Sequence, residues 1–180
     1  IARVTPGGRA LAHLDKPLYL AALWHDAVDQ PLLDPRSRIE SLCFGRSAVI
    51  PRAAREGGAK TIGVIPESLV KIEFADHDSD VLHVVKDMRE RKGMIEELSD
   101  AFIVLPGGAG TLEELFEIWV GRFLKFHNKP IVILDPYDLY KPLVELINHL
   151  EGENFVKPGM QELIFWARSV DEALNHIAGK

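Results

Sequence analysis

Short apolar runs alternate with longer amphipathic stretches along most of the chain. The apolar runs of strand length are residues 39–44, 60–65, 82–85, 101–105, 130–134 and 164–167. Apolar positions with helical spacing occur between or after these runs, at residues 51–56, 86–98, 112–126, 140–150 and 170–177. Strands that alternate with helices indicate a parallel sheet flanked by helices. We therefore expect an α/β fold.

The first 38 residues follow this alternation less closely. Residues 1–15 show little periodicity, and we expect an irregular arm there. Apolar positions in residues 18–28 have helical spacing, and two prolines, Pro31 and Pro35, follow them. The sequence therefore predicts an N-terminal arm and helical extension over residues 1–38, and a single domain over residues 39–180.

Three glycines follow the fourth apolar run and lead into a predicted helix. They are Gly107, Gly108 and Gly110, and Thr111 comes next, with Glu114 three residues later. The Thr-x-x-Glu spacing is a capping-box signal for a helix start. Backbone N–H groups of a glycine turn and of a helix N-terminus favour an anion such as a phosphate. An ordinary strand-to-helix turn with a capping box explains the same residues, so the turn alone leaves both interpretations open.

Charged side chains are predicted near the same edge of the sheet. Ligands of parallel sheets bind at the carboxyl ends of the strands, where this turn and a second one at Gly45 are expected. Arg91 and Lys92 lie on the helix before the fourth run, and an arginine presents a bidentate fork to phosphate or carboxylate. Glu114 beside a helix N-terminus and a cation is expected to be an ionised carboxylate, which suits cleavage through an oxocarbenium-like transition state. A capping role for Glu114 and a solvated helix face for Arg91 and Lys92 remain open alternatives.

Composition narrows the class of protein. A chain of 180 residues is long enough for one domain with a full core. The formal net charge of −6 argues against a general nucleic-acid or anionic-membrane surface, and no apolar run approaches the ~18 residues of a membrane span. The single cysteine, Cys43, cannot form an internal disulfide and fits a reducing compartment. No signal-peptide pattern is present, so we expect a cytoplasmic protein.

Two separated segments resemble the paired signatures of one family. Residues 88–92 and 106–114 resemble the Met-His-x-Arg-Lys and Pro-Gly-Gly-x-Gly-Thr-x-x-Glu motifs of the LOG ("Lonely Guy") family, whose members are often labelled lysine decarboxylases. Residues 63–73 are similar to the family's Gly-Val-Ile-Pro-x-x-Leu segment and its downstream glutamate, and residues 127–130 are also familial. The resemblance covers about residues 52–178, with the two motifs in the family's order and spacing.

The resemblance implies a Rossmann-like nucleotide-binding domain that works as a homodimer or larger assembly. It implies hydrolysis of the N-glycosidic bond of a nucleoside 5′-monophosphate, of the AMP or isopentenyl-AMP type, to free base and ribose 5-phosphate. Arg91 and Glu114 would be the catalytic pair. The residues that would bind the substrate are Gly107, Gly108, Gly110 and Thr111 at the phosphate, with Met88, Lys92, Glu73 and Gly45 around the rest of the pocket. No metal or organic cofactor is implied, and nothing marks the pyridoxal lysine that an amino-acid decarboxylase would need.

The sequence departs from the family pattern at two places. Arg89 replaces the usual histidine of the first motif, which leaves the role of that position open. The link between Gly45 and Pro51 is too short for the strand, helix and glycine loop that the family has there, because a parallel crossover needs a dozen or more residues. We therefore expect that a stretch of the natural chain is absent between about Gly45 and Pro51.

Two other functions fit parts of the pattern. Molybdenum-cofactor carrier proteins share this general fold and a similar glycine-rich loop, and a carrier would bind a nucleotide or cofactor without releasing a base. An assembly subunit with a degenerate site would be consistent with the shortened region at residues 45–51. The presence of both Arg91 and Glu114 favours the enzyme, because a carrier has no need of this pair.

Overall fold

The computed structural model describes residues 2–4, 18–23, 49–70 and 76–179. The strands among them are β1 (Ala2–Val4), β2 (Leu18–Leu23), β3 (Lys60–Pro66), β4 (Val81–Val85), β5 (Ala101–Val104), β6 (Ile131–Leu134) and β7 (Ile164–Ala167). The α-helices are α1 (Val49–Glu56), α2 (Glu67–Val70), α3 (Met88–Leu98), α4 (Ala109–Phe123), α5 (Lys141–Gly152) and α6 (Val170–Ile177), and a short 3₁₀ helix covers Gln161–Leu163.

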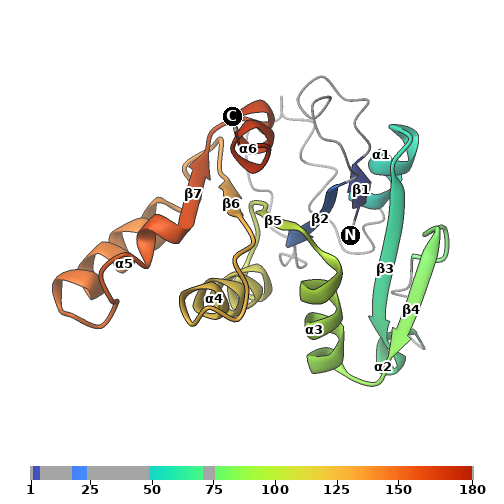
Figure 1. Cartoon of the computed structure of the whole chain (residues 1–180), viewed down its shortest axis with the longest axis horizontal. Coiled ribbons are helices and arrows are strands. Elements are labelled where there is room, and N and C mark those ends of the chain that lie inside the picture. The colour runs from blue at the N-terminus through green and yellow to red at the C-terminus, as the bar shows by residue number, and fades with distance from the viewer. Residues whose placement is uncertain (1, 5–17, 24–48, 71–75, 180) are drawn as a thin grey trace.

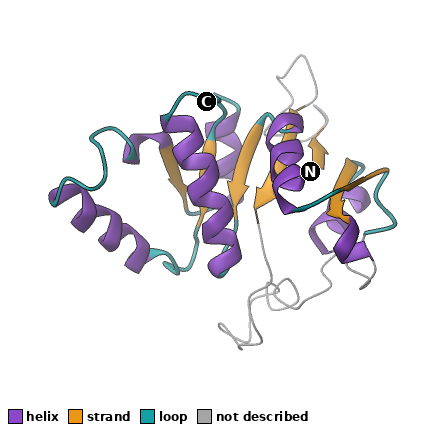
Figure 2. Cartoon of the chain, turned by 90° about the horizontal axis from the view of Figure 1, so that it is seen from below, coloured by secondary structure: helices purple, strands orange, loops and turns teal. Residues whose placement is uncertain are grey.

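The strands form one sheet in the order β4-β3-β1-β2-β5-β6-β7. The pairings β2–β5, β3–β4, β5–β6 and β6–β7 are parallel, whereas the three-residue β1 runs antiparallel to both of its neighbours. Strands alternate with helices along the described chain, and helices cover both faces of the sheet (Figures 1 and 2). The expected Rossmann-like α/β fold is therefore confirmed.

The two faces of β5, β6 and β7 pack against different helices. Phe102, Ile131 and Ile133 point to one face, where they join Leu115 and Trp119 of α4 and the buried side of α5 in one apolar cluster. On the other face Val132 and Ala167 contact Ala173 of α6. Because both faces are covered, these strands consist of nearly continuous apolar residues rather than an alternating pattern. The covered strands hold the carboxyl edge of β5 rigidly in place.

Most of the predicted elements match the structure, with three corrections. Residues 2–4 of the expected irregular arm form strand β1, because they pair with β2 and β3. Residues 18–23 form strand β2 and not the expected helix, because they pair in parallel with β5 and antiparallel with β1. A six-residue apolar run fits a buried strand or a helix segment equally well, and only its partners distinguish them. The helix after the glycine turn begins at Ala109, three residues earlier than expected.

Several expectations concern residues outside the described ranges. These are the arm at residues 5–15, the remainder of the N-terminal helix at residues 24–28, the strand at 39–44, Gly45, Glu73 and the expected break between Gly45 and Pro51. The division of the chain at residue 38 also stays a prediction.

Candidate active site

The glycine turn after β5 opens directly into the N-terminus of α4. Gly108 is the N-cap residue, with no hydrogen bond from a capping side chain, and the first helical bond runs from Leu112 N to Gly108 O at 3.1 Å. The amides of the first turn of an α-helix have no acceptor four residues earlier in the helix, and they form the positive end of its dipole. The expected capping box is wrong: Thr111 lies inside the first turn, and Glu114 lies one turn further on and bonds elsewhere. The N-terminus of α4 is consistent with the expected anion-binding site formed by backbone N–H groups.

Gly107 lies in close contact with Thr111 of the first turn of α4. A Cβ atom at this position would lie 2.2 Å from Thr111 Oγ1, which is closer than any side chain tolerates. Its N–H donates to the hydroxyl of Tyr140 at 2.8 Å, and that hydroxyl donates in turn to Leu105 O at 2.8 Å. The Gly107 amide is thus already used within the protein, and the amides at Gly108 and Gly110 are better placed to meet an anion.

Arg91 and Glu114 come together as the sequence predicts. Arg91 Nη1 donates to Glu114 Oε1 at 2.9 Å, and Arg91 Nε donates to Val64 O in β3 at 3.2 Å. The Glu114 side chain is 7% exposed and that of Arg91 is 21% exposed, so the pair is largely shielded from water. The ion pair joins α3 to α4, while the second bond ties α3 to the sheet. A buried carboxylate is therefore held in one orientation near the glycine turn.

Lys92 forms a second bridge between the same two helices. Its Nζ lies 2.6 Å from Glu113 Oε1 and 2.6 Å from Glu117 Oε2. The hydrogen bonds to these two carboxylates raise the pKa of Lys92 against the opposing effect of burial. The sequence suggested that Lys92 lines the nucleotide pocket. In the structure its ammonium group forms ion pairs with two glutamates of α4.

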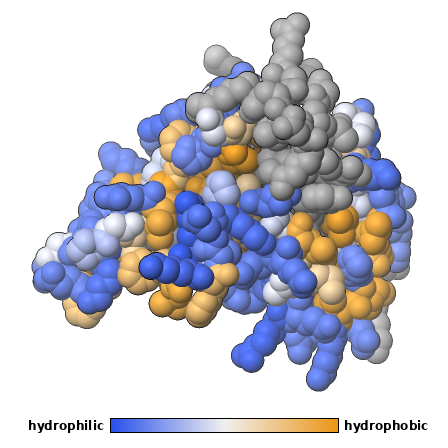
Figure 3. Space-filling model, viewed as in Figure 1, coloured by the Kyte–Doolittle hydropathy of each residue, from blue (hydrophilic) through white to orange (hydrophobic). Residues whose placement is uncertain are grey.

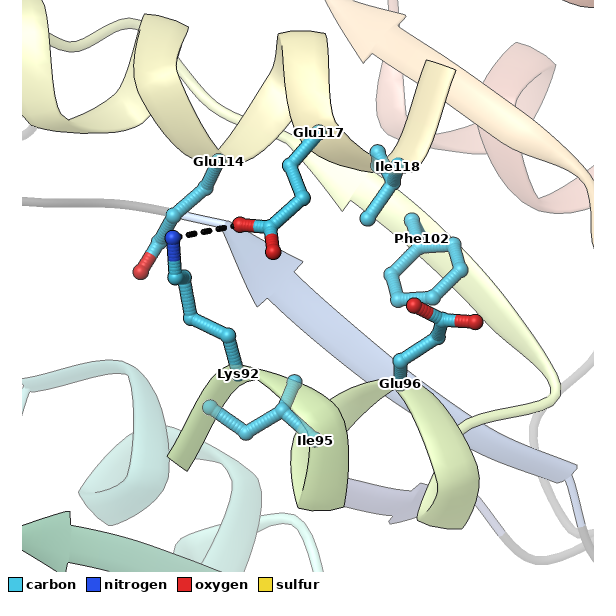
Figure 4. Close-up of a pocket in the computed structure, with 7 residues that line it drawn as sticks. All are labelled: Lys92, Ile95, Glu96, Phe102, Glu114, Glu117 and Ile118. Carbon is cyan, nitrogen blue, oxygen red and sulfur yellow. Dashed lines mark ion pairs between the residues drawn. The ribbon is translucent and has the colours of Figure 1, made fainter. Parts of the chain in front are cut away.

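A small pocket lies between α3 and α4 beside this bridge (Figure 4). Lys92, Glu114 and Glu117 lie at one end of it with Ile95 next to Lys92. Glu96, Phe102 and Ile118 lie at the other end. Its volume of about 20 Å³ holds about one water molecule. A nucleotide does not fit in this pocket.

The remaining predicted site residues are spread around this centre. Met88 is the first residue of α3 and is 37% exposed, and Asp87 caps that helix by accepting from Arg89 N and Glu90 N. Gly110 and the fully buried Thr111 lie in the first turn of α4. Among the described residues no group of three His, Cys, Asp or Glu side chains is arranged to hold a metal ion. No helix in the described ranges is long and apolar enough to cross a membrane.

Tyr140 and Asp135 are site residues that sequence reasoning missed. Asp135 directly follows β6, and its carboxylate accepts from Leu139 N at 2.9 Å and from Tyr140 N at 2.8 Å. Tyr140 then reaches the glycine turn, 33 residues away in sequence. The sequence signal that could have found Tyr140 is a tyrosine in the loop after a predicted strand, at the edge of the sheet where the glycine turn was expected.

Comparisons with known proteins agree with the fold and the motifs. The sequence pattern of the family described as "Possible lysine decarboxylase" matches residues 48–177. A cytokinin riboside 5′-monophosphate phosphoribohydrolase of Mycobacterium tuberculosis is 46% identical over 129 residues, which cover 72% of this chain and 69% of that protein. The enzymes of the same name from Rhodococcoides fascians and Mycobacterium marinum are each 41% identical, over 72% of this chain and 66% and 69% of their own lengths. This chain thus spans about two thirds of each relative. The match over most of its length shows that the chain belongs to the LOG family.

Proposed function

We propose that this protein is a phosphoribohydrolase that cleaves the N-glycosidic bond of a nucleoside 5′-monophosphate. The proposed substrate is a cytokinin riboside 5′-monophosphate, that is, an N6-substituted AMP, and the relatives named for this activity support the choice. Water supplies the hydroxyl group at C1′, the bond from C1′ to the base nitrogen breaks, and a proton from that water ends on the base. The products are the free base and ribose 5-phosphate.

One observation carries the proposal: an arginine fixes a shielded carboxylate close to a glycine turn at a helix N-terminus. Bond cleavage develops positive charge at C1′ and the ring oxygen, and a nearby carboxylate stabilises that charge or orients the attacking water. Glu114 is suited to this role because Arg91 holds it at 2.9 Å in a largely buried position. A side chain that is already oriented loses no freedom on reaching the transition state.

The start of α4 would hold the 5′-phosphate. The amides at Gly108 and Gly110 belong to the open end of a helix of 15 residues, where the backbone dipole favours a monoester dianion. Thr111 and Gly107 pack closely against each other within this turn. The base would then contact Met88 and Lys92. Glu73 and Gly45, which lie outside the described residues, are the other pocket residues that the family resemblance implies. We place no metal or cofactor in this reaction.

We further propose that the protein assembles with copies of itself, as a homodimer or a larger oligomer, in the cytoplasm. Phe116, Val120 and Leu124 are 38%, 42% and 52% exposed and follow one another at four-residue intervals on α4. Figure 3 shows hydrophobic residues at the surface in this part of the molecule. Glu113 and Glu117 lie on the same side of the helix by their spacing. A second copy packed on this stripe would therefore border the proposed site, and a self-complementary patch is what a twofold dimer uses.

The proposal is tested by incubating the protein with N6-isopentenyl-AMP, AMP and CMP, and with the matching nucleosides, and measuring released base by chromatography. We expect base from N6-isopentenyl-AMP or AMP and none from the nucleosides, because the monoester anchors the substrate. The variant Glu114→Gln keeps the shape of the side chain and removes its charge. We expect it to lower kcat by roughly 100-fold or more, as for the loss of a charge-stabilising group in a preorganised site.

The matched control is Glu97→Gln, which changes an exposed glutamate on α3 in the same way. Full turnover in Glu114→Gln would contradict the role of Glu114. Equal activity on nucleosides would contradict a phosphate-anchored site. Tight nucleotide binding with no release of base by the unaltered protein would favour the carrier function instead.

A further inference from the structure

The hydroxyl group of Tyr140 forms hydrogen bonds with the backbone of the glycine turn. Tyr140 Oη accepts from Gly107 N at 2.8 Å and donates to Leu105 O at 2.8 Å, and Gly107 O lies 3.3 Å away. A tyrosine hydroxyl has one proton to donate and can accept at the same time. One side chain thus fixes the backbone on both sides of Pro106, where the chain leaves β5 and turns toward α4.

Tyr140 is itself held rigidly. It is 4% exposed and belongs to the main apolar cluster with Leu143 and Ile147 of α5. Its backbone N–H donates to the carboxylate of Asp135, which is 6% exposed. Asp135 N donates to Ala167 O of β7 at 2.9 Å. The hydroxyl is therefore connected to the end of β6 and β7 through short bonds and cannot move independently of the sheet.

The hydroxyl of Tyr140 maintains a closely packed conformation of the glycine turn. Gly107 lies so close to Thr111 that no side chain fits between them. Burial raises the pKa of Tyr140 to about 12, so the hydroxyl keeps its proton and donates at any working pH. Because the Gly107 amide is used internally, the direction of the following amides depends on where this bond holds the chain.

We propose that Tyr140 is a positioning residue that sets the conformation of the monoester-binding turn at residues 105–110. The inference rests on the proposed function, since it assigns Tyr140 to the phosphate end of that site. It acts through the backbone of Gly107 and does not touch the substrate. Its contribution is the same for bound substrate and transition state, because the monoester is remote from the bond that breaks. Loss of such an interaction raises KM and leaves kcat unchanged.

The test is the variant Tyr140→Phe, which removes only the hydroxyl, with Tyr137→Phe as the matched control on an exposed tyrosine of the same loop. We expect Tyr140→Phe to raise KM for the nucleoside 5′-monophosphate by roughly three- to tenfold, as for the loss of one ordinary hydrogen bond. The Kd for ribose 5-phosphate, measured by calorimetry, should rise by the same factor, with kcat unchanged. The Gly107 amide should exchange with solvent faster than in the unaltered protein.

An unchanged KM and Kd in Tyr140→Phe would overturn the inference, as would a fall in kcat at constant KM. A thermal unfolding curve distinguishes these results from a loss of fold. The calorimetric measurement also separates this inference from the proposed function. If the unaltered protein binds ribose 5-phosphate but releases no base from any nucleotide, the proposed function fails, and the change in Kd still decides the role of Tyr140.

Discussion

The guanidinium group of Arg91 makes two bonds in different directions. Its Nε donates to Val64 O in β3, and its Nη1 donates to Glu114 Oε1 in α4. Arginine can do this because its donors are fixed in one planar fork, whereas a lysine ammonium is a single point on a flexible stem. The position of Glu114 therefore depends on the geometry of Arg91 as well as on its charge.

The variant Arg91→Lys separates these two contributions. It keeps the positive charge near Glu114 but cannot hold both the carboxylate and Val64 O in the observed geometry. We expect kcat/KM to fall on the order of 100-fold, the effect that a displacement of about 1 Å in a reacting group can have. Steady-state release of base measures the change. Arg52→Lys is the control, since Arg52 is an exposed arginine of α1 outside the two motifs. Activity in Arg91→Lys equal to that control would show that charge alone is sufficient.

Helix α1 is joined to the loop before β4 by a partly buried ion pair. Arg55 Nη1 donates to Asp76 Oδ2 at 2.9 Å and to Thr61 Oγ1 at 3.1 Å, and Ser79 Oγ also donates to Asp76. Burial alone would raise the pKa of Asp76, but the hydrogen bonds from Arg55 and Ser79 and the charge of Arg55 outweigh it and lower the pKa below 3.8. The folded state therefore favours the ionised form of Asp76.

This pair predicts a pH dependence of stability. Because the pKa of Asp76 is lower in the folded state, its stabilising effect is complete above the unfolded value of 3.8 and is lost as the pH falls through the folded value. Asp76→Asn should lower the free energy of unfolding at pH 7 by about 1.5–3 kcal/mol, as for one lost hydrogen bond to a charged group. It should also flatten the decline of stability below pH 4. Urea unfolding at pH 7, 4 and 3 measures both effects, with Asp78→Asn, an exposed aspartate of the same loop, as the control; parallel pH profiles for the two variants would contradict the account.

Local pattern was sufficient for most elements of this fold and for part of the site. The runs at residues 101–105 and 130–134 could be recognised as strands because both of their faces are covered, and the helix carrying Arg91 followed from its own spacing. Arg91 and Glu114 were expected to meet because their helices begin at the carboxyl edge of a parallel sheet. These inferences need only the period of the sequence and the rule for parallel connections.

Elements fixed by distant partners could not be predicted in this way. Residues 18–23 are a strand because β1 and β5 bond to them, and nothing within the run itself says so. Helix α4 begins at Ala109 and not at Leu112, and Gly107 can lie against Thr111 of its first turn only because it has no side chain. The bond from Tyr140 to Gly107 joins residues 33 positions apart. Each of these depends on tertiary contacts that override local preference.

At the scale of the whole molecule, the apolar surface is unevenly distributed. In the described part of the chain, α4 exposes Phe116, Val120 and Leu124 on the side next to the bridge made by Lys92. The edge strand β4 exposes Val81 and Val84, and Figure 3 shows hydrophobic residues over β3 and β4. The stripe on α4 is the one adjacent to the site, so assembly through it would couple the oligomer to catalysis.

The variant Val120→Glu tests this coupling by placing a charge at the centre of the stripe. An unpaired carboxylate within a packed apolar interface is strongly unfavourable, so we expect the assembled protein to dissociate into single chains. Sedimentation velocity would show the change in mass, and release of base per chain should fall with it, because the partner would no longer cover the side of α4 next to Lys92. Val170→Glu is the control, since Val170 is 58% exposed on α6 at the opposite face of the sheet. Assembly through α4 would be contradicted if the unaltered protein is a single chain at micromolar concentration, or if the Val120→Glu variant keeps its mass. A dissociated variant with full activity would confirm the interface but show that it does not affect the site.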